Sequence, residues 1–234
     1  MPAAQGTLLC VANYPANTGY AWDFLEGLYA AVADRVVASG ITTFVAYPLI
    51  EVAPKTLAAS VARPVTLDVS LRSLVSLWTV GAFIHRHRVR VVYFTDQPVF
   101  STAYWWLRLM GVRHIIVYDH TSGARTPPRG VKYALKWLVC RLPGLAADRV
   151  IAVSDYVAER HRTVSLVPFG RVTRVWNGVQ VPPDGAGTQA VRESLGVAAD
   201  RPLVVCCGRA APEKGVECLL RAFDRVITRL SPGG

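Results

Sequence analysis

Two cations in the C-terminal part of the sequence, Arg209 and Lys214, have the spacing of a phosphate-binding loop. They stand in the run VVCCGRAAPEKG, residues 204–215, which predicts a strand, a tight turn at Gly208 and a helix that begins near Lys214. A helix N-terminus offers free N–H groups and a partial positive charge to an anion. An arginine adds a forked contact and a lysine adds a point charge. The loop is therefore predicted to hold a diphosphate and to stabilise it as a leaving group without a metal ion. The alternative is that the two cations only cap a surface loop.

Other polar candidates follow predicted strands in the first half of the sequence. Asp96 comes after the apolar run 89–94, and His120 comes after the run 114–118. Because the carboxyl ends of parallel strands face the ligand crevice, both side chains are candidates for a site there. A neutral imidazole can hydrogen-bond a substrate hydroxyl, and the alternative for His120 is a helix-cap or loop histidine. Asp96 could equally be a turn or cap residue. Ser154 and Asp155 are predicted to begin a helix, with an N-cap role favoured over a catalytic one.

These candidates are positioned by alternating strands and helices, which predict a Rossmann-like α/β fold with a parallel sheet and helices on both faces. The short, continuously apolar strands are typical of a sheet covered on both sides. Strands are predicted at Thr7–Ala12, Ile41–Ala46, Val89–Phe94, His114–Tyr118, Arg149–Val153, Val172–Trp176 and Pro202–Cys207. Helices are predicted at Ala21–Ser39, Leu71–Arg86, Thr102–Met110, Val131–Arg141, Asp155–Arg162, Gln189–Leu195 and Gly215–Leu230.

A domain boundary is predicted in the run NGVQVPPDGAG, residues 177–187, which collects turn formers and helix breakers. The N-terminal domain would comprise residues 1–180. Residues 181–234 would form the linker and the start of a second α/β domain. A single strand with its helices cannot bury its own faces, so this second domain is expected to be incomplete or to dock elsewhere.

The composition excludes several classes of protein. Hydrophobic residues make up 52% of the 234 residues and charged residues 18%, so global disorder is excluded. No apolar run is long enough for a membrane span and no signal peptide is readable, which favours a cytoplasmic protein. The five cysteines include no CxxC pair, and we expect buried or half-buried thiols and no metal site.

The positive charge is concentrated in the middle of the sequence. Residues 84–174 hold 15 basic and 5 acidic residues, which accounts for the whole net charge of +10. Such a field attracts phosphorylated substrates or an anionic membrane surface, although a basic face that only aids solubility fits equally well. Nucleic acid is disfavoured because no aromatic residues interleave with the basic ones in a binding pattern.

The motifs together resemble those of family 4 glycosyltransferases, which have the GT-B fold. Besides the run at 204–215, ADRVIAVS at 147–154 is similar to a strand of the family, and WNGV at 176–179 is similar to the turn before its second domain. VRESLGV at 191–197 resembles the helix that leads into its donor strand, and PANTG at 15–19 resembles its first, glycine-rich loop with one glycine rather than two. The resemblance spans nearly the whole sequence.

The resemblance implies a retaining, metal-independent transfer of a sugar from a nucleotide-sugar, with no other cofactor, to a cell-envelope polysaccharide or a lipid-linked acceptor. The N-terminal domain would bind the acceptor, at the inner face of the plasma membrane if the acceptor is a lipid, and the second domain would bind the nucleotide-sugar. His120 would be the catalytic histidine against the sugar, Arg209 and Lys214 would bind the donor diphosphate, and Gly19 would let the first loop approach it. Candidates for substrate contacts are Asn17, Asp96 and Glu213.

One departure from the family concerns a pair of glutamates in an E-x7-E motif, which the 234 residues do not contain. Glu213 and Glu217 are not that pair. We therefore expect the chain alone to bind the donor poorly and to be weakly active or inactive. The alternative function is a non-catalytic GT-B-like binding module that needs a partner chain. A dinucleotide-binding protein, a P-loop protein and a hydrolase are disfavoured because GxGxxG, GxxxxGK[ST] and GxSxG are all missing.

Overall fold

The computed structural model describes residues 6–19, 21–121, 123, 125–178, 188–208 and 212–230. The chain divides into two compact units, Met1–Gly178 and Val179–Gly234. Each unit is described by itself below.

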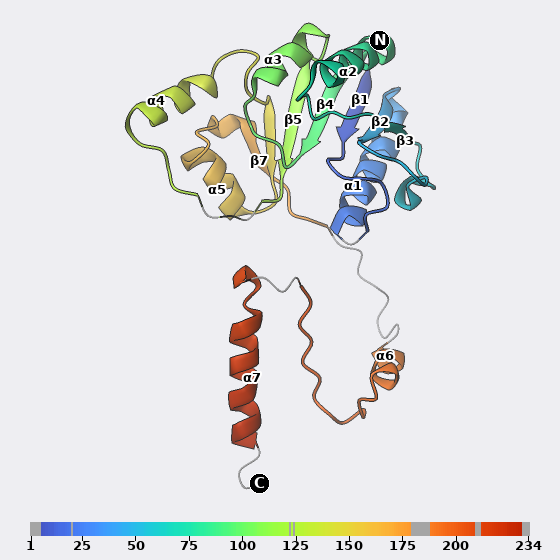
Figure 1. Ribbon diagram of the computed structural model, residues 1–234, viewed down its shortest axis with the longest axis vertical. Helices are drawn as coiled ribbons and strands as arrows, with labels where there is room; N and C mark the ends of the chain where they lie inside the picture. Colours follow the sequence, from blue (N-terminus) through green and yellow to red (C-terminus); the bar gives the residue numbers. More distant parts are fainter. Residues whose placement is uncertain are drawn as a thin grey trace. The chain divides into compact units, whose positions relative to one another are not determined.

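The first unit is built on a seven-stranded, entirely parallel sheet with the order β3-β2-β1-β4-β5-β6-β7 (Figure 1). β1 lies inside the sheet. β2 and β3 follow on one side of it, and β4, β5, β6 and β7 follow on the other side. Its strands are β1 (Thr7–Val11), β2 (Thr42–Tyr47), β3 (Arg63–Thr66), β4 (Val89–Thr95), β5 (His114–Asp119), β6 (Arg149–Ala152) and β7 (Val172–Arg174).

Alternating side chains of the strands build a separate hydrophobic core on each face of the sheet. In β1, Leu9 and Val11 pack with the helices of one face, and Leu8 and Cys10 pack with α1 on the other. This arrangement confirms the predicted α/β fold with helices on both faces. The helices of the unit are α1 (Ala21–Val36), α2 (Leu74–His87), α3 (Thr102–Leu109), α4 (Gly130–Val139) and α5 (Asp155–Thr163), with 3-10 turns at Val37–Ser39, Lys55–Leu57 and Phe169–Arg171.

Serine caps fix where three of these helices begin. The Ser73, Ser101 and Ser154 side chains each accept a hydrogen bond from a backbone N–H in the first turn of α2, α3 and α5. The predicted N-cap role of Ser154 is therefore confirmed, with Val157 N donating to Ser154 Oγ at 3.2 Å.

One strand of the sheet was not predicted. β3 lies at the edge, it contains Pro64, and Arg63 and Thr66 in it are exposed. Proline and exposed residues remove the continuous apolar run by which the inner strands are recognised, and proline is tolerated in a sheet chiefly at an edge.

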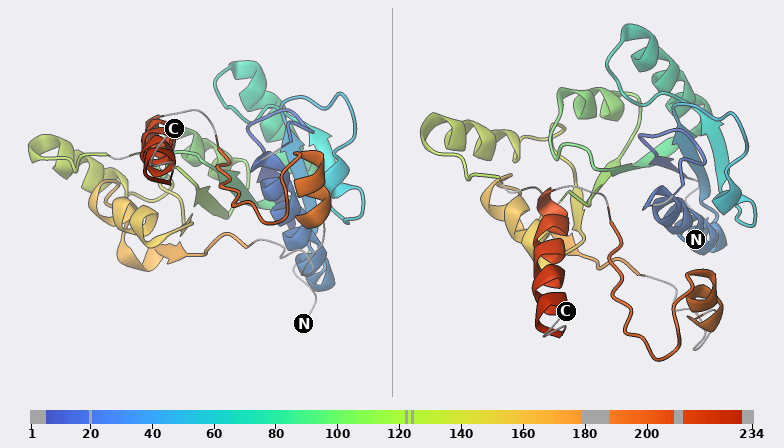
Figure 2. Two further views of the ribbon diagram at one scale, coloured as in Figure 1. Left: turned by 90° about the horizontal axis from the view of Figure 1, so that it is seen from below. Right: turned by 60° about the horizontal axis from the view of Figure 1, so that its bottom comes forward.

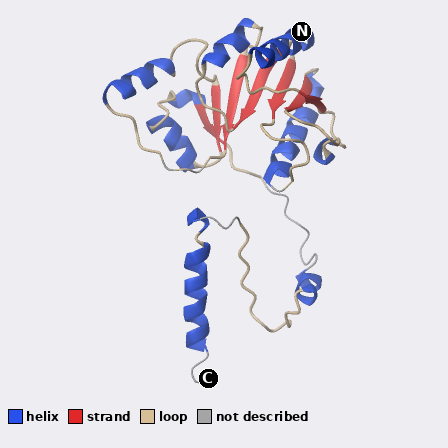
Figure 3. Cartoon of the chain, in the orientation of Figure 1, coloured by secondary structure: helices blue, strands red, loops and turns tan. Residues whose placement is uncertain are grey.

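The described part of the second unit contains α6 (Thr188–Ser194), a 3-10 turn (Pro212–Lys214) and α7 (Val216–Leu230), joined by an extended segment (Figure 3). The predicted strand at Pro202–Cys207 is wrong, because this segment pairs with no other strand among the described residues. A strand exists only where its N–H and C=O groups meet those of a neighbour. The predicted helix at Gly215–Leu230 is confirmed within one residue.

The cysteine prediction is correct for the first unit and wrong for the second. Cys10 and Cys140 are buried, whereas Cys206, Cys207 and Cys218 are exposed. The exposure of Cys206 and Cys207 follows from the missing strand pairing, because no sheet or helix among the described residues covers the apolar run that contains them. No helix in the described part of the chain has both the length and the hydropathy needed to cross a membrane.

Candidate active site

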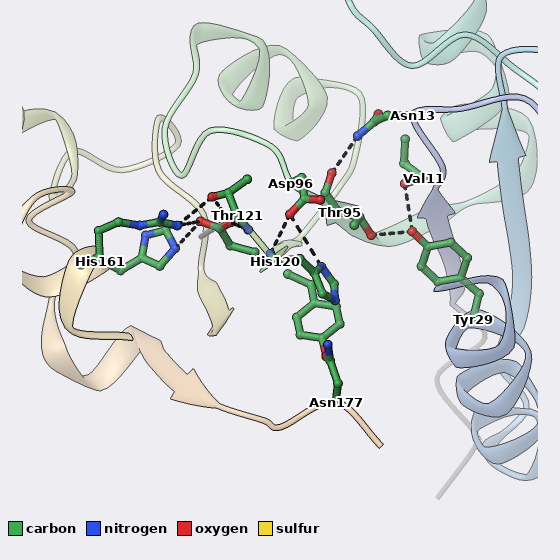
Figure 4. A network of polar contacts seen from close by, with 12 residues as sticks. Val11, Asn13, Tyr29, Thr95, Asp96, His120, Thr121, His161 and Asn177 are labelled. Carbon is green, nitrogen blue, oxygen red and sulfur yellow. Dashed lines mark hydrogen bonds and ion pairs between the residues drawn. The ribbon is translucent and has the colours of Figure 1, made fainter. Parts of the chain in front are cut away.

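Asp96 and His120 meet at the carboxyl edge of the sheet, where β4 and β5 end side by side. The backbone N–H of His120 donates to Asp96 Oδ1 at 2.7 Å, and His120 Nδ1 lies 3.6 Å from the same oxygen (Figure 4). Parallel pairing of Thr95 with Tyr118 sets this juxtaposition. The structure thus brings together two residues that the sequence singled out separately.

The His120 imidazole is held by packing, and both of its ring nitrogens are buried. Its ring packs edge-on against Tyr118, with centroids 4.0 Å apart, and against Phe24 at 6.4 Å. Neither ring nitrogen has a hydrogen-bond partner among the described residues. A largely buried imidazole with both nitrogens unpaired is suited to a hydrogen bond with a substrate hydroxyl.

Asp96 adopts a backbone conformation that few side chains tolerate. Its φ is +54°, in the left-handed region, which aspartate and asparagine enter more readily than other residues with a side chain. The turn it makes directs Oδ1 toward the start of the loop after β5. Residues held in this region are often found at functional sites.

A buried ionic cluster lies directly behind this pair, and sequence reasoning missed it. Asp119, the last residue of β5, accepts at Oδ2 from Arg160 Nη2 at 2.8 Å and lies 2.8 Å from His161 Nε2. Its Oδ1 accepts from the backbone N–H of Thr121 at 2.7 Å. Arg160 also donates to Thr121 Oγ1 at 2.7 Å, so the start of the loop that carries His120 is fixed to α5.

The cluster holds Asp119 in its charged form. Burial by itself raises the pKa of this carboxyl, but the contact with His161 and the hydrogen bonds from Thr121 outweigh it and hold the pKa well below its usual range. The Asp119 side chain is only 8% exposed, so its charge is neutralised by the protein rather than by water.

The lowered pKa of Asp119 predicts that the free energy of unfolding depends on pH. A carboxyl with a depressed folded pKa stabilises the fold fully above its unfolded pKa of about 3.9, and this contribution is lost as the pH falls below that value. We expect the difference in unfolding free energy between the unaltered chain and Asp119→Asn to shrink as the pH is lowered from about 4 to about 2. Urea unfolding at a series of pH values measures it, and a difference that stays constant over this range would refute the assignment.

A pocket of about 230 Å³ opens beside Asp96, between the loop after β4, α4 and α5. Its polar lining includes Asp96, Thr121, Arg125, Lys136 and His161. Burial lowers the pKa of Lys136, with a further lowering by neighbouring cations. The pocket lining therefore combines two cations, Arg125 and Lys136, with two carboxylates, Asp96 and Asp119.

The first loop, after β1, is organised by Asn17. This residue has φ +58°, and its side chain donates to the carbonyls of Val52 and Ala53 at 2.9 and 3.2 Å and accepts from Lys55 N at 3.0 Å. Its amide is thus used to hold a neighbouring loop in place. Gly19 has φ +75°, and a Cβ built there would meet no atom within 4 Å, so the space beside it is open.

The donor side of the predicted site is described only in part. Arg209 lies outside the described residues, as does the side chain of Glu213. Lys214 ends the 3-10 turn and is exposed, with its Cγ 3.9 Å from a Cβ built at Gly208. Gly19 and Lys214 belong to different units, so a joint diphosphate site stays a prediction.

The basic middle of the sequence is partly internal. Arg160 is 4% exposed and paired with Asp119, and Arg108 forms an ion pair with Asp148 at 3.0 Å. These two arginines therefore do not contribute to a basic surface, although their place in the basic stretch of the sequence had suggested that they would. The N–H groups of Arg108 also reach the carbonyls of Arg113, Gly144 and Ala146.

The fold and the site define an open parallel α/β domain with a polar site at the carboxyl edge of its sheet. The family model of Glycosyltransferase Family 4 matches residues 25–181. The chain belongs to this family, and it is thereby a member of a transferase family. No curated protein matches the sequence.

A solved structure of a glycosyltransferase agrees with the fold. The chain is similar to a glycosyltransferase from Rickettsia africae ESF-5, with a TM-score of 0.65 and 15% identity over 95% of this chain and 58% of that one. The chain thus spans less than two thirds of that protein. Two short-chain dehydrogenases, from Streptomyces avermitilis and Burkholderia vietnamiensis, share 16% identity at a TM-score of 0.32, covering 100% and 87% of this chain and 99% and 97% of theirs.

Proposed function

We propose that the chain carries the acceptor-side domain, residues 1–180, and the start of the donor-side domain, residues 181–234, of a retaining, metal-independent glycosyltransferase. It would transfer a sugar from a nucleotide-sugar to a cell-envelope polysaccharide or a lipid-linked acceptor. The observation that carries the proposal is the Asp96–His120 pair at the carboxyl edge of the sheet in a family 4 domain. His120 would hydrogen-bond a sugar hydroxyl and orient the reacting centre, while Asp96 would hold the His120 loop.

The other candidates take supporting roles in this proposal. Arg209 and Lys214 would bind the donor diphosphate, and Gly19 would leave room for it beside the first loop. Asn17 would act through its loop contacts rather than on substrate. The pocket lined by Arg125 and Lys136 would receive the acceptor, whose phosphate would meet two cations. The reaction would take place at the cytoplasmic face of an anionic membrane.

An assay with radiolabelled nucleotide-sugars and a membrane lipid extract tests the proposal. We expect slow transfer to lipid, unchanged by a metal chelator, with the anomeric configuration of the donor retained in the product. Transfer that stops on chelation, or a product of inverted configuration, would refute the proposed mechanism.

One observation favours a second function, a binding module that needs a partner chain. The segment Pro202–Cys207 exposes Val204 and Val205 and pairs with no strand among the described residues. A companion chain would then supply the missing strands. This alternative predicts a stable partner that co-purifies with the chain from its native cells, which the transferase proposal does not require.

A further inference from the structure

Helix α4 presents an apolar stripe away from the protein. Val131, Leu135 and Leu138 recur at spacings of four and three, which places them on one face of the helix. Their exposed fractions are 86%, 60% and 48%. A surface helix normally turns such a stripe toward the core, yet no residue of α4 is buried. Figures 1 and 2 show the helix projecting beyond the sheet.

The orientation of the stripe is fixed by the residues that follow the helix. Cys140 is buried on the opposite side from the stripe, with its Sγ 3.0 Å from the carbonyl of Ser165. Arg141 donates to the carbonyl of Leu166 at 3.2 Å. These contacts hold the C-terminal end of α4 against the segment after α5, so the stripe cannot turn inward without breaking them.

Basic residues are concentrated in the segment that carries the stripe. Between Asp119 and Asp148 the sequence has five basic residues and no acidic one. No ion pair joins any of these five to a carboxylate in the described part of the chain. The Arg141 guanidinium lies over the Trp137 ring at 4.1 Å, an arrangement suited to a membrane interface. The five cations are Arg125, Arg129, Lys132, Lys136 and Arg141.

We propose that residues 125–142 dock the protein on an anionic lipid surface, with Val131, Leu135 and Leu138 entering the headgroup boundary. An apolar stripe flanked by cations is the pattern of helices that lie in the membrane interface. A second copy of the chain fits less well, because a symmetric contact would bring two such positive segments together.

The position of α4 connects this surface to the candidate site. Lys136 and Arg125 line the pocket beside Asp96, and Lys136 lies on the side of α4 opposite the stripe, so a lipid-linked acceptor would extend around this helix from the docked surface to reach the pocket. This part of the inference rests on the proposed function, since it assumes an acceptor carried on lipid. The docking itself is measured without any transfer.

Co-sedimentation with vesicles tests the docking. The vesicles are phosphatidylcholine alone or phosphatidylcholine with phosphatidylglycerol. The test variant is L135D/L138D, and the matched control is L74D/V75D, which places the same two charges at exposed apolar positions of α2. We expect the unaltered chain to bind the anionic vesicles, high salt to release it, L135D/L138D to bind at least about tenfold less and the control to bind normally.

Several results would overturn the proposal. They are no binding by the unaltered chain, equal binding by L135D/L138D, or an equal loss in L74D/V75D. A dimer in solution that L135D/L138D converts to a monomer would instead assign the stripe to a protein interface. Loss of transfer with intact vesicle binding would count against the proposed function alone.

Discussion

Replacing Asp119 with alanine is expected to lower the free energy of unfolding of the first unit by about 3–5 kcal/mol. The substitution leaves the Arg160 guanidinium buried without its carboxylate and removes the acceptor of the Thr121 N–H. An uncompensated buried charge is among the most costly defects in a fold whose total stability is about 5–15 kcal/mol. All six tryptophans lie within the first unit, so urea unfolding followed by tryptophan fluorescence reports on that unit.

Asp155 supplies a matched control for this prediction. It also pairs with an arginine, Arg174, at 2.6 Å, but its side chain is 75% exposed. Asp155→Ala should therefore cost no more than about 1 kcal/mol. If Asp119→Ala proves too unstable to purify, Asp119→Asn keeps the shape of the side chain and should show an intermediate loss. Equal stability of the Asp119 and Asp155 variants would show that the buried cluster does not hold the fold.

Replacing His120 with alanine is expected to bring the slow sugar transfer of the chain below detection. The imidazole makes no hydrogen bond within the described structure, so its loss should change the chemistry more than the fold. The contact between Asp96 and the loop runs through the backbone N–H of His120 and survives the substitution. Initial rates with radiolabelled nucleotide-sugar measure the effect.

His114 provides the control on the same strand. It begins β5, at the end of the strand opposite to His120, and it is exposed. His114→Ala should leave the transfer rate within about twofold of the unaltered chain, because it is far from the carboxyl edge. Transfer by His120→Ala at the unaltered rate would remove this histidine from the mechanism.

Most of the fold of the first unit follows from the sequence, because continuous apolar runs identify strands that are covered on both sides. The other six strands of the sheet were predicted this way, and β3 was missed because Pro64 and its exposed neighbours interrupt the pattern. The opposite error occurred at Pro202–Cys207. There the local pattern is that of a strand, but pairing is a property of two segments and cannot be inferred from one.

The residues of the site could be predicted from the sequence only where they follow the end of a strand. Asp96 and His120 were found because each comes directly after an apolar run. The cluster of Asp119, Arg160 and His161 was not found, since its partners are 41 and 42 residues apart in sequence and belong to no motif. Arg160 looks like part of a basic surface until the structure shows it buried. A charged residue at the last position of a buried strand is the signal that could have suggested the need for a partner.

The two outer strands of the sheet have a consequence for how the protein behaves at high concentration. β3 has four residues and includes a proline, and β7 has only three. Each edge strand therefore offers few unpaired backbone N–H and C=O groups to a strand of another chain. Both edges of the sheet are for this reason poor templates for the growth of fibrils. Both edge strands are short, and Pro64 in β3 has no backbone N–H to donate. We therefore expect heat or high concentration to produce amorphous aggregates rather than amyloid fibrils.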